Sequence, residues 1–446
     1  MKLFLTALCF ICFQSIGITQ EFNGRWEMVK VETEDGKTIE ELPQWIDFID
    51  GRSFYIGDVG SNKTTVGGEW VYDKTNSELI LHSAPESKHF GRYTVSALTE
   101  ATGIIEKSGR KIYLERVSYK VGNIDADATW KYQFESGYPN RNPSLDDEHI
   151  YFGSDMTPVK CLDRKTGELI WTSVAKVGSK GFFHTMAQDD ESIYINGTQG
   201  IIYKINKEDG KVLWQKECRF DDDILNKITL LNDILYVNPY DSVFLALNTD
   251  GEEVWKTKLP TLIFSYTISD GEIYGNIGNG ELVVLDALSG KIVHQKLVTK
   301  KSRFFPEPFV SDKTVIVSHT DGVLKAYDLQ LKMKWSNAKD NYFRFYQVGD
   351  ALVVMQKNKM LRLNPENGAL IWEYTVGDLQ VAPTFFEGNI YVQGRDDFSI
   401  LDVETGDLMY VSLFKHKSFM QPIVTRDEMI LGYSGTILRI ANPLGE

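Results

Sequence analysis

Residues 162–171 read LDRKTGELIW, and this stretch contains the pattern that determines the fold. A Leu-Asp pair leads into a Thr-Gly turn, and a tryptophan follows after a short apolar run. Similar turns recur at spacings of 36 to 43 residues and begin at Leu162, Ile205, Leu247, Leu285, Tyr327, Leu363, Leu401 and Ile440. Self-similarity at such a period is typical of solenoids and propellers.

Two further markers keep the same phase as the turn. A doublet rich in β-branched, aliphatic and aromatic residues, such as Ile193-Tyr194, begins 11 or 12 residues before each turn. An aromatic residue or a histidine follows the start of the first seven turns by 8 or 9 residues, at Trp171, Trp214, Trp255, His294, Trp335, Trp372 and Tyr410. Each repeat then has room for four short strands, which is one propeller blade.

The eighth repeat reaches Glu446 without its tryptophan strand. A segment of the missing type, Thr129-Trp-Lys-Tyr132, lies before the first complete repeat. If this strand completes the last blade, the ring closes and two exposed sheet edges disappear. The sequence therefore predicts an all-β chain in which residues 129–446 form an eight-bladed β-propeller, with seven blades as the competing count.

The repeated turn followed by tryptophan resembles the tryptophan-docking repeat of pyrroloquinoline quinone (PQQ)-like β-propellers. The resemblance implies tryptophan side chains that pack between neighbouring blades, and we interpret six of them as structural: Trp130, Trp171, Trp214, Trp255, Trp335 and Trp372. His294 and Tyr410 depart from the pattern. The resemblance therefore implies looser docking of blades four and seven.

Residues 20–118 do not fit the repeat. Their alternating apolar and polar runs, separated by turn residues, predict a small antiparallel β-barrel. Gly24-Arg-Trp26 and the late Arg116 resemble lipocalin-like domains, and the resemblance implies that Arg116 covers the ring of Trp26. Such a barrel is either filled by its own side chains or holds a small apolar ligand. Residues 119–128 are expected to form a linker to the ring.

Residues 1–19 are expected to form a signal peptide, because Lys2 precedes an apolar run that is too short to span a bilayer. Neither Cys9 nor Cys12 follows the small residue of a lipoprotein signal, so we expect no lipid anchor. The prediction is an exported, soluble protein of the periplasm or the extracellular space, without a transmembrane segment.

Charge and cysteine content exclude some classes of protein. The chain contains 48 Lys plus Arg against 62 Asp plus Glu, and the net charge of −14 argues against a nucleic-acid partner. Only Cys161 and Cys218 remain once the signal is removed. Two cysteines do not make a disulfide scaffold, and the sequence leaves open whether they pair.

No catalytic, cofactor or metal site is predicted, because the chain has no adjacent cysteines, no His-Glu-x-x-His and no Gly-x-Ser-x-Gly. We therefore expect no bound PQQ. Loops that break the repeat are the usual place for function in a propeller. Aromatic and basic residues of four such loops form a candidate binding rim: Phe182, Phe183, His184, Phe304, Phe305, Tyr342, Phe343, Arg344, Tyr346 and His416.

Three hypotheses for function follow. The first is a non-catalytic binding or scaffold protein of the bacterial cell envelope, whose ring binds another envelope protein. It resembles propellers that assist outer-membrane assembly, although the lipid anchor of those proteins is not expected here. The second is a PQQ-dependent dehydrogenase. The third is a carrier of a small apolar ligand in the N-terminal barrel.

Overall fold

The chain forms two compact units, residues 1–121 and 122–446, which are considered separately. The computed structural model describes residues 22, 24–39, 44–49, 53–58, 64–82, 90–133, 143–153, 158–176, 186–196, 201–218, 225–239, 242–300, 306–318, 323–337, 344–356, 359–376, 379, 381–394, 397–414, 416, 420–433 and 435–445. None of the described helices is long and apolar enough to cross a membrane.

The first unit is a closed antiparallel barrel. Eight strands follow one another in chain order, and β1 pairs with β9 to close the sheet, while the short β2 adds to the end of β1. The strands are β1 (Gly24–Thr33), β2 (Thr38–Ile39), β3 (Gln44–Ile49), β4 (Ser53–Asp58), β5 (Thr64–Asp73), β6 (Glu78–His82), β7 (Gly91–Leu98), β8 (Thr102–Lys107) and β9 (Arg110–Arg116). The predicted barrel is confirmed.

Aromatic side chains pack together in the described interior of the barrel. Phe22 is fully buried, and its ring centroid lies 5.4 Å from that of Phe48 and 6.4 Å from that of Trp70. The indole of Trp26 donates to the carbonyl of Phe22 at 2.8 Å. The Arg116 guanidinium carbon lies 4.3 Å from the centroid of the Trp26 ring, a cation–π contact that contributes about 0.5–2 kcal/mol.

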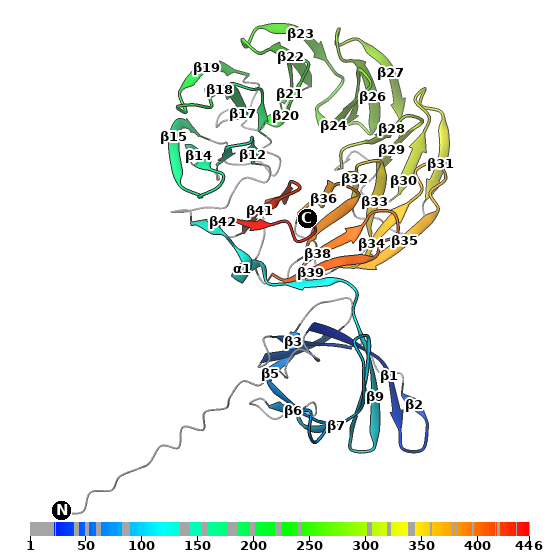
Figure 1. Ribbon diagram of the computed structural model, residues 1–446. Coiled ribbons are helices and arrows are strands. Elements are labelled where there is room, and N and C mark those ends of the chain that lie inside the picture. The colour runs from blue at the N-terminus through cyan, green and yellow to red at the C-terminus, as the bar shows by residue number, and fades with distance from the viewer. Residues whose placement is uncertain are drawn as a thin grey trace, which may run out of the picture. The chain divides into compact units, whose positions relative to one another are not determined.

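The second unit is a ring of eight blades of four strands each, which confirms the predicted propeller, and β10 (Lys120–Gly122) adds a fifth strand beside β39 in one of them. In Figure 1 strands β12, β20, β24 and β36 lie toward the centre of the ring, and β15, β19, β23, β27 and β31 lie on its outer margin. We number the blades in chain order, from β12–β15 as blade 1 to β40–β42 as blade 8, and call the contact between consecutive blades a seam.

The first four blades contain strands of two to eight residues. Blade 1 has β12 (Ser144–Leu145), β13 (His149–Phe152), β14 (Pro158–Asp163) and β15 (Leu169–Lys176); blade 2 has β16 (Ala187–Gln188), β17 (Ser192–Asn196), β18 (Ile201–Asn206) and β19 (Val212–Glu217). Blade 3 has β20 (Leu225–Leu231), β21 (Ile234–Pro239), β22 (Val243–Asn248) and β23 (Glu253–Lys258); blade 4 has β24 (Ile263–Ser269), β25 (Glu272–Ile277), β26 (Glu281–Asp286) and β27 (Ile292–Leu297).

The other four blades repeat this arrangement. Blade 5 has β28 (Phe309–Ser311), β29 (Thr314–Ser318), β30 (Leu324–Tyr327) and β31 (Met333–Asn337); blade 6 has β32 (Arg344–Val348), β33 (Ala351–Gln356), β34 (Lys359–Leu363) and β35 (Leu370–Thr375). Blade 7 has β36 (Thr384–Phe386), β37 (Asn389–Gln393), β38 (Asp397–Asp402) and β39 (Leu408–Leu413); blade 8 has β40 (Ile423–Val424), β41 (Glu428–Tyr433) and β42 (Thr436–Ala441).

The repeated polar turn connects the third and fourth strands of a blade. In blade 1 the Asp163 carboxylate accepts hydrogen bonds from the backbone N–H groups of Lys165 and Thr166, at 2.9 and 2.7 Å. Gly167 then takes a φ of 74°, which residues with a side chain rarely adopt. The turn therefore favours Asp or Asn at its start, where the side chain accepts backbone hydrogen bonds, and Gly at its end, where φ is positive.

Blade 8 obtains its outer strand from the other end of the unit. β11 (Trp130–Gln133) pairs antiparallel with β42, and Trp130 lies opposite Arg439. This pairing supplies the strand that the eighth repeat lacks and leaves no blade incomplete in the ring.

The segment before β11 is folded onto the propeller unit. β10 (Lys120–Gly122) leads into the single-turn helix α1 (Ile124–Asp127), which is capped by the Asn123 side chain. Ile124 is fully buried, and its backbone N–H donates to the Ser412 hydroxyl at 3.0 Å. This part of the expected linker is therefore helical and packed.

Candidate interaction site

The described part of the predicted rim comes from two places. Phe182, Phe183, His184, Phe304, Phe305, Tyr342 and Phe343 lie outside the described residues. Arg344 and Tyr346 lie on β32, two residues apart, so that both side chains project to one face of the strand. Arg344 is exposed, whereas Tyr346 is partly buried against the core between blades 6 and 7.

His416 belongs to a different cluster, in the connection between blades 7 and 8. Its Nε2 lies 2.8 Å from Oδ2 of Asp125 on α1, and its ring stacks on Tyr433 with centroids 4.0 Å apart. Lys131 holds the other oxygen of Asp125 at 3.0 Å. Desolvation by burial raises the pKa of Asp125, but the hydrogen bonds and charges of His416 and Lys131 together outweigh it, and the pKa lies below its usual value. His416 therefore fastens α1 to the ring.

Six seams use the same tryptophan contact. Each tryptophan indole N–H donates, at 2.8–3.1 Å, to the backbone carbonyl that follows the first Asp, Asn or equivalent residue of the next blade's turn. The indole ring lies against the turn glycine, where an added Cβ would come within 2.5–3.3 Å of ring atoms. The donors are Trp130, Trp171, Trp214, Trp255, Trp335 and Trp372.

The seam between blades 4 and 5 lacks the tryptophan and also lacks the glycine. His294 replaces the tryptophan, and Leu331 takes the place of the turn glycine, with a φ of 60°. The turn keeps its backbone hydrogen bond from residue 331 to Asp328 at 2.9 Å, as Gly251 does to Asn248 at 3.0 Å. Leu331 is buried in the apolar cluster that joins the two blades, so an aliphatic side chain fills this seam.

Tyr410, the second departure from the pattern, contacts the segment that precedes α1. A Cβ at Gly122 would clash with the Tyr410 side chain, so only glycine fits at this position. The backbone N–H of Ile124 also donates to the Ser412 hydroxyl. Tyr410 and Ser412, two residues apart on β39, therefore both contact the segment before β11.

Sequence reasoning missed a recurring set of buried amide side chains, two of which contact the next blade. Four blades carry an amide side chain three residues after the start of the doublet, and all four are buried: Asn196, Asn238, Asn276 and Gln393. The Asn238 amide donates to the carbonyl of Ile263 at 2.9 Å, and the Asn276 amide donates to that of Pro306 at 3.1 Å. The recurrence of Asn and Gln at this position was the signal that could have revealed them.

The closing seam, between blades 8 and 1, contains a buried ionic cluster. The two carboxylate oxygens of Glu428 pair with Arg164 and Arg439, and the carboxylate is 5% exposed. Arg164 also donates to the carbonyl of Asp146 at 2.6 Å. The carbonyl of Arg164 accepts a hydrogen bond from the Trp130 indole, so this residue of blade 1 contacts both β11 and β41 of blade 8.

The described residues do not fit a quinone site with adjacent cysteines, because Cys161 and Cys218 are unpaired, buried and in separate clusters. Burial raises the pKa of the Cys161 thiol to about 12 and that of the Cys218 thiol to about 11. Within the described ranges no three His, Cys, Asp or Glu side chains are grouped to hold a metal ion.

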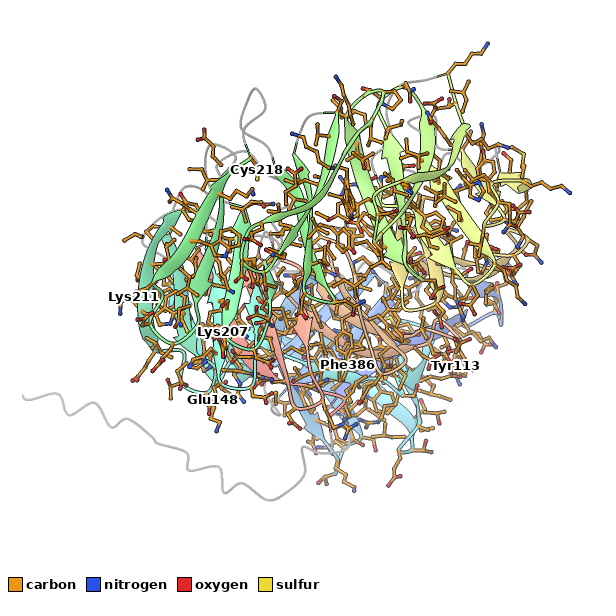
Figure 2. All side chains as sticks on the ribbon, turned by 90° about the horizontal axis from the view of Figure 1, so that it is seen from above. Tyr113, Glu148, Lys207, Lys211, Cys218 and Phe386 are labelled. Atoms are coloured by element: carbon orange, nitrogen blue, oxygen red, sulfur yellow. The ribbon has the colours of Figure 1, made fainter. Side chains whose placement is uncertain are left out.

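One face of the ring is acidic. The turns between the first and second strands of all eight blades lie at this face, and they carry Asp146, Asp147, Glu148, Asp189, Asp190, Glu191, Asp233, Asp270, Asp312, Asp350, Glu387 and Asp427. In Figure 2 the turn residues Glu148 and Lys207 lie toward the lower side, and Cys218, at the end of β19, lies toward the upper side. The same turns carry two basic residues, Lys313 and Arg426, so their net charge is negative.

A family model described as "Outer membrane protein assembly factor BamB" matches residues 155–265 and 246–445, which are the blades of the ring. The chain belongs to this family. An outer membrane protein assembly factor BamB of Yersinia pestis is 21% identical over 335 residues, which cover 67% of this chain and 84% of the relative. The quinoprotein alcohol dehydrogenase PedH of Pseudomonas putida is 27% identical over 110 residues, 22% of this chain and 18% of that enzyme.

The fold is also that of a solved BamB. The crystal structure of BamB from Moraxella catarrhalis superposes with a TM-score of 0.56 at 15% identity, over 72% of this chain and 98% of that one. Membership of the family confirms the predicted PQQ-like propeller and favours the envelope scaffold hypothesis over the dehydrogenase. The family match begins in blade 1, and the barrel lies outside it.

Proposed function

We propose that this chain is a non-catalytic scaffold of the bacterial cell envelope that takes part in the assembly of outer membrane proteins. The observation that carries the proposal is the family match over the ring, since the matching family and relatives are outer membrane protein assembly factors. The blades support it, because their recurring tryptophan, glycine and amide residues serve contacts between blades.

The proposal places the protein in the periplasm or at the outer membrane, bound to another envelope protein and without a bound quinone. The same proposal includes the predicted signal peptide at residues 1–19 and a soluble mature protein without a lipid anchor. The partner would bind at the side of the ring that carries Arg344, because the opposite face is ringed by carboxylates.

Capture of partners from crosslinked envelope extract tests this function. The tagged full chain is expected to enrich an outer membrane protein or one of its assembly factors. Arg344→Glu should reduce that capture, whereas Arg426→Glu should not, because Arg426 is exposed in a turn of the acidic face. Enrichment of no envelope protein, or equal loss in both variants, would contradict the proposal.

A dehydrogenase is tested on the same protein. Purified chain mixed with PQQ and calcium should show no stoichiometric change in the absorption spectrum of the quinone. A saturable spectral shift with a one-to-one endpoint would reinstate the enzyme hypothesis.

A further inference from the structure

Strand β27, the outer strand of blade 4, has a free edge. It ends its sheet, and no other described strand pairs with its outer side. Figure 1 shows β27 on the outer margin of the ring. A strand at a sheet edge presents unpaired N–H and C=O groups to which an extended polypeptide can bind.

Aliphatic side chains are exposed on this strand and on the turn before it. Leu288 in the turn is 79% exposed, and on the strand Val293 is 45% and Leu297 53% exposed. Ile292 is also exposed. β27 is also one of the two outer strands in which another residue replaces the docking tryptophan. The replacement, His294, lies between the exposed residues Val293 and Leu297.

The charge of this region differs from that of the whole chain. The sequence has 62 Asp plus Glu in 446 residues, yet none between Asp286 and Glu307. Lys291, Lys296 and Lys300 fall within the same stretch. The neighbouring carboxylate of Glu281 on β26 accepts a hydrogen bond from Gln295 at 2.8 Å. β27 is therefore a cationic and apolar strip on an acidic protein.

The outer strand of the next blade continues this character. Residues 329–337 contain no carboxylate, and Met333 is half exposed between Lys332 and Lys334. Lys334 pairs with Glu366 of blade 6, whereas Lys296 lies 5.5 Å from the centroid of the Tyr327 ring. Two adjacent blades thus share the same surface chemistry.

We propose that the edge of β27 binds an extended segment of a partner polypeptide that carries aliphatic side chains and a carboxylate-rich end. The aliphatic side chains of the segment pack on Val293 and Leu297, and its carboxylates face the lysines. The inference rests on the proposed function, because it gives the scaffold a second surface for a partner polypeptide, separate from the side of the ring that carries Arg344.

The register defines where the segment pairs. His294, Gln295, Lys296 and Leu297 pair regularly with β26, and a bulge at Val293 interrupts the ladder. Bulges at this position recur in the outer strands of the other blades and limit pairing at that end. The segment therefore gains backbone hydrogen bonds from His294 onward, and Val293 provides an apolar contact beside the ladder.

Fluorescence anisotropy with a labelled ten-residue probe tests the site on the full chain. The probe alternates valine and threonine and ends in three glutamates, and a matched probe ends in three lysines. Val293→Glu should weaken binding of the acidic probe about ten-fold, through repulsion and lost apolar contact. The matched control is Val254→Glu, since Val254 is the equivalent residue of blade 3 and is 47% exposed. Leu297→Gln is the second variant, should Val293→Glu not fold.

The expected result is binding of the acidic probe by the wild type and by Val254→Glu, with loss in Val293→Glu and Leu297→Gln. Equal binding of both probes, or equal loss in Val254→Glu, overturns the proposal. So does a loss confined to binding of phosphatidylglycerol vesicles, or a dimer of this chain that Val293→Glu dissociates. If the wild type and Val293→Glu capture the same envelope partner equally well, this site is wrong while the proposed function stands.

Discussion

The seam between blades 4 and 5 can be converted to the contact that the other seams use. Trp in place of His294 would face Leu331, where six other seams have glycine whose added Cβ would lie 2.5–3.3 Å from the indole. His294→Trp alone should therefore overpack the seam and lower the free energy of unfolding by about 1–3 kcal/mol.

Leu331→Gly alone removes a buried side chain, which costs about 2–5 kcal/mol, and relieves about 1–2 kcal/mol of left-handed backbone strain. The net expected loss is about 1–3 kcal/mol. In the double variant the new indole rests on glycine and donates to the carbonyl of residue 329. Its stability should return to within about 1 kcal/mol of the wild type, which is a favourable coupling of about 2–5 kcal/mol.

Urea unfolding of the four proteins measures this coupling, and hydrogen exchange of β26 and β30 reports whether the effect is local. If the losses of the two single variants add in the double variant, residues 294 and 331 do not form a docking pair and the reasoning fails. If the double variant recovers but exchange changes equally in blades 1 and 2, the recovery has another cause.

Three further outcomes are expected. Gly290→Ala should lower the free energy of unfolding by about 1–3 kcal/mol more than Gly271→Ala, because both glycines have positive φ but only the first has an indole ring at 2.5 Å; equal losses by urea unfolding would contradict the docking role. Glu428→Gln should weaken the pairing of β11 by about 3–5 kcal/mol, seen as faster hydrogen exchange in residues 130–133, and unchanged exchange would refute it. Cys161 and Cys218 should resist alkylation up to pH 9 in the folded protein and react in urea, because their raised pKa values keep the thiols neutral; rapid labelling of the native protein would show that they are not buried.

The sequence predicted the ring because its markers are periodic. Doublet, turn and tryptophan each recur in phase, so a single interpretation accounts for strand number, blade number and the place of Trp130 at the closing seam. The tryptophan contact followed from the same repeat, although the glycine against which each indole packs belongs to the next blade. Only the structure pairs Trp255 with Gly290, because the two residues come from different repeats.

Contacts that occur once were not predictable. His416 meets Asp125 across 291 residues, and nothing in the local sequence of either residue marks the other. Leu331 stands where the other turns have glycine, and its presence is explained only by His294 on the neighbouring blade, which replaces the tryptophan. A position that recurs in every repeat can be recognised from the sequence. A pair such as His294 and Leu331, in which one replacement compensates for the other, shows in the sequence only as two unrelated exceptions.

The closing strand has a consequence for the order in which the molecule folds. The backbone N–H of Thr129 donates to the carbonyl of Arg439, a partner 310 residues away in the sequence, whereas strands β12 to β39 pair within blades 1 to 7 as hairpins of neighbouring strands, to which β10 is added beside β39. Chain entropy makes closure of such a loop about 2 kcal/mol more costly than a contact across one repeat. Ring closure is therefore expected to be the last step of folding, and until β42 has formed the propeller remains an open arc in which the N-terminal strand β11 has no partner.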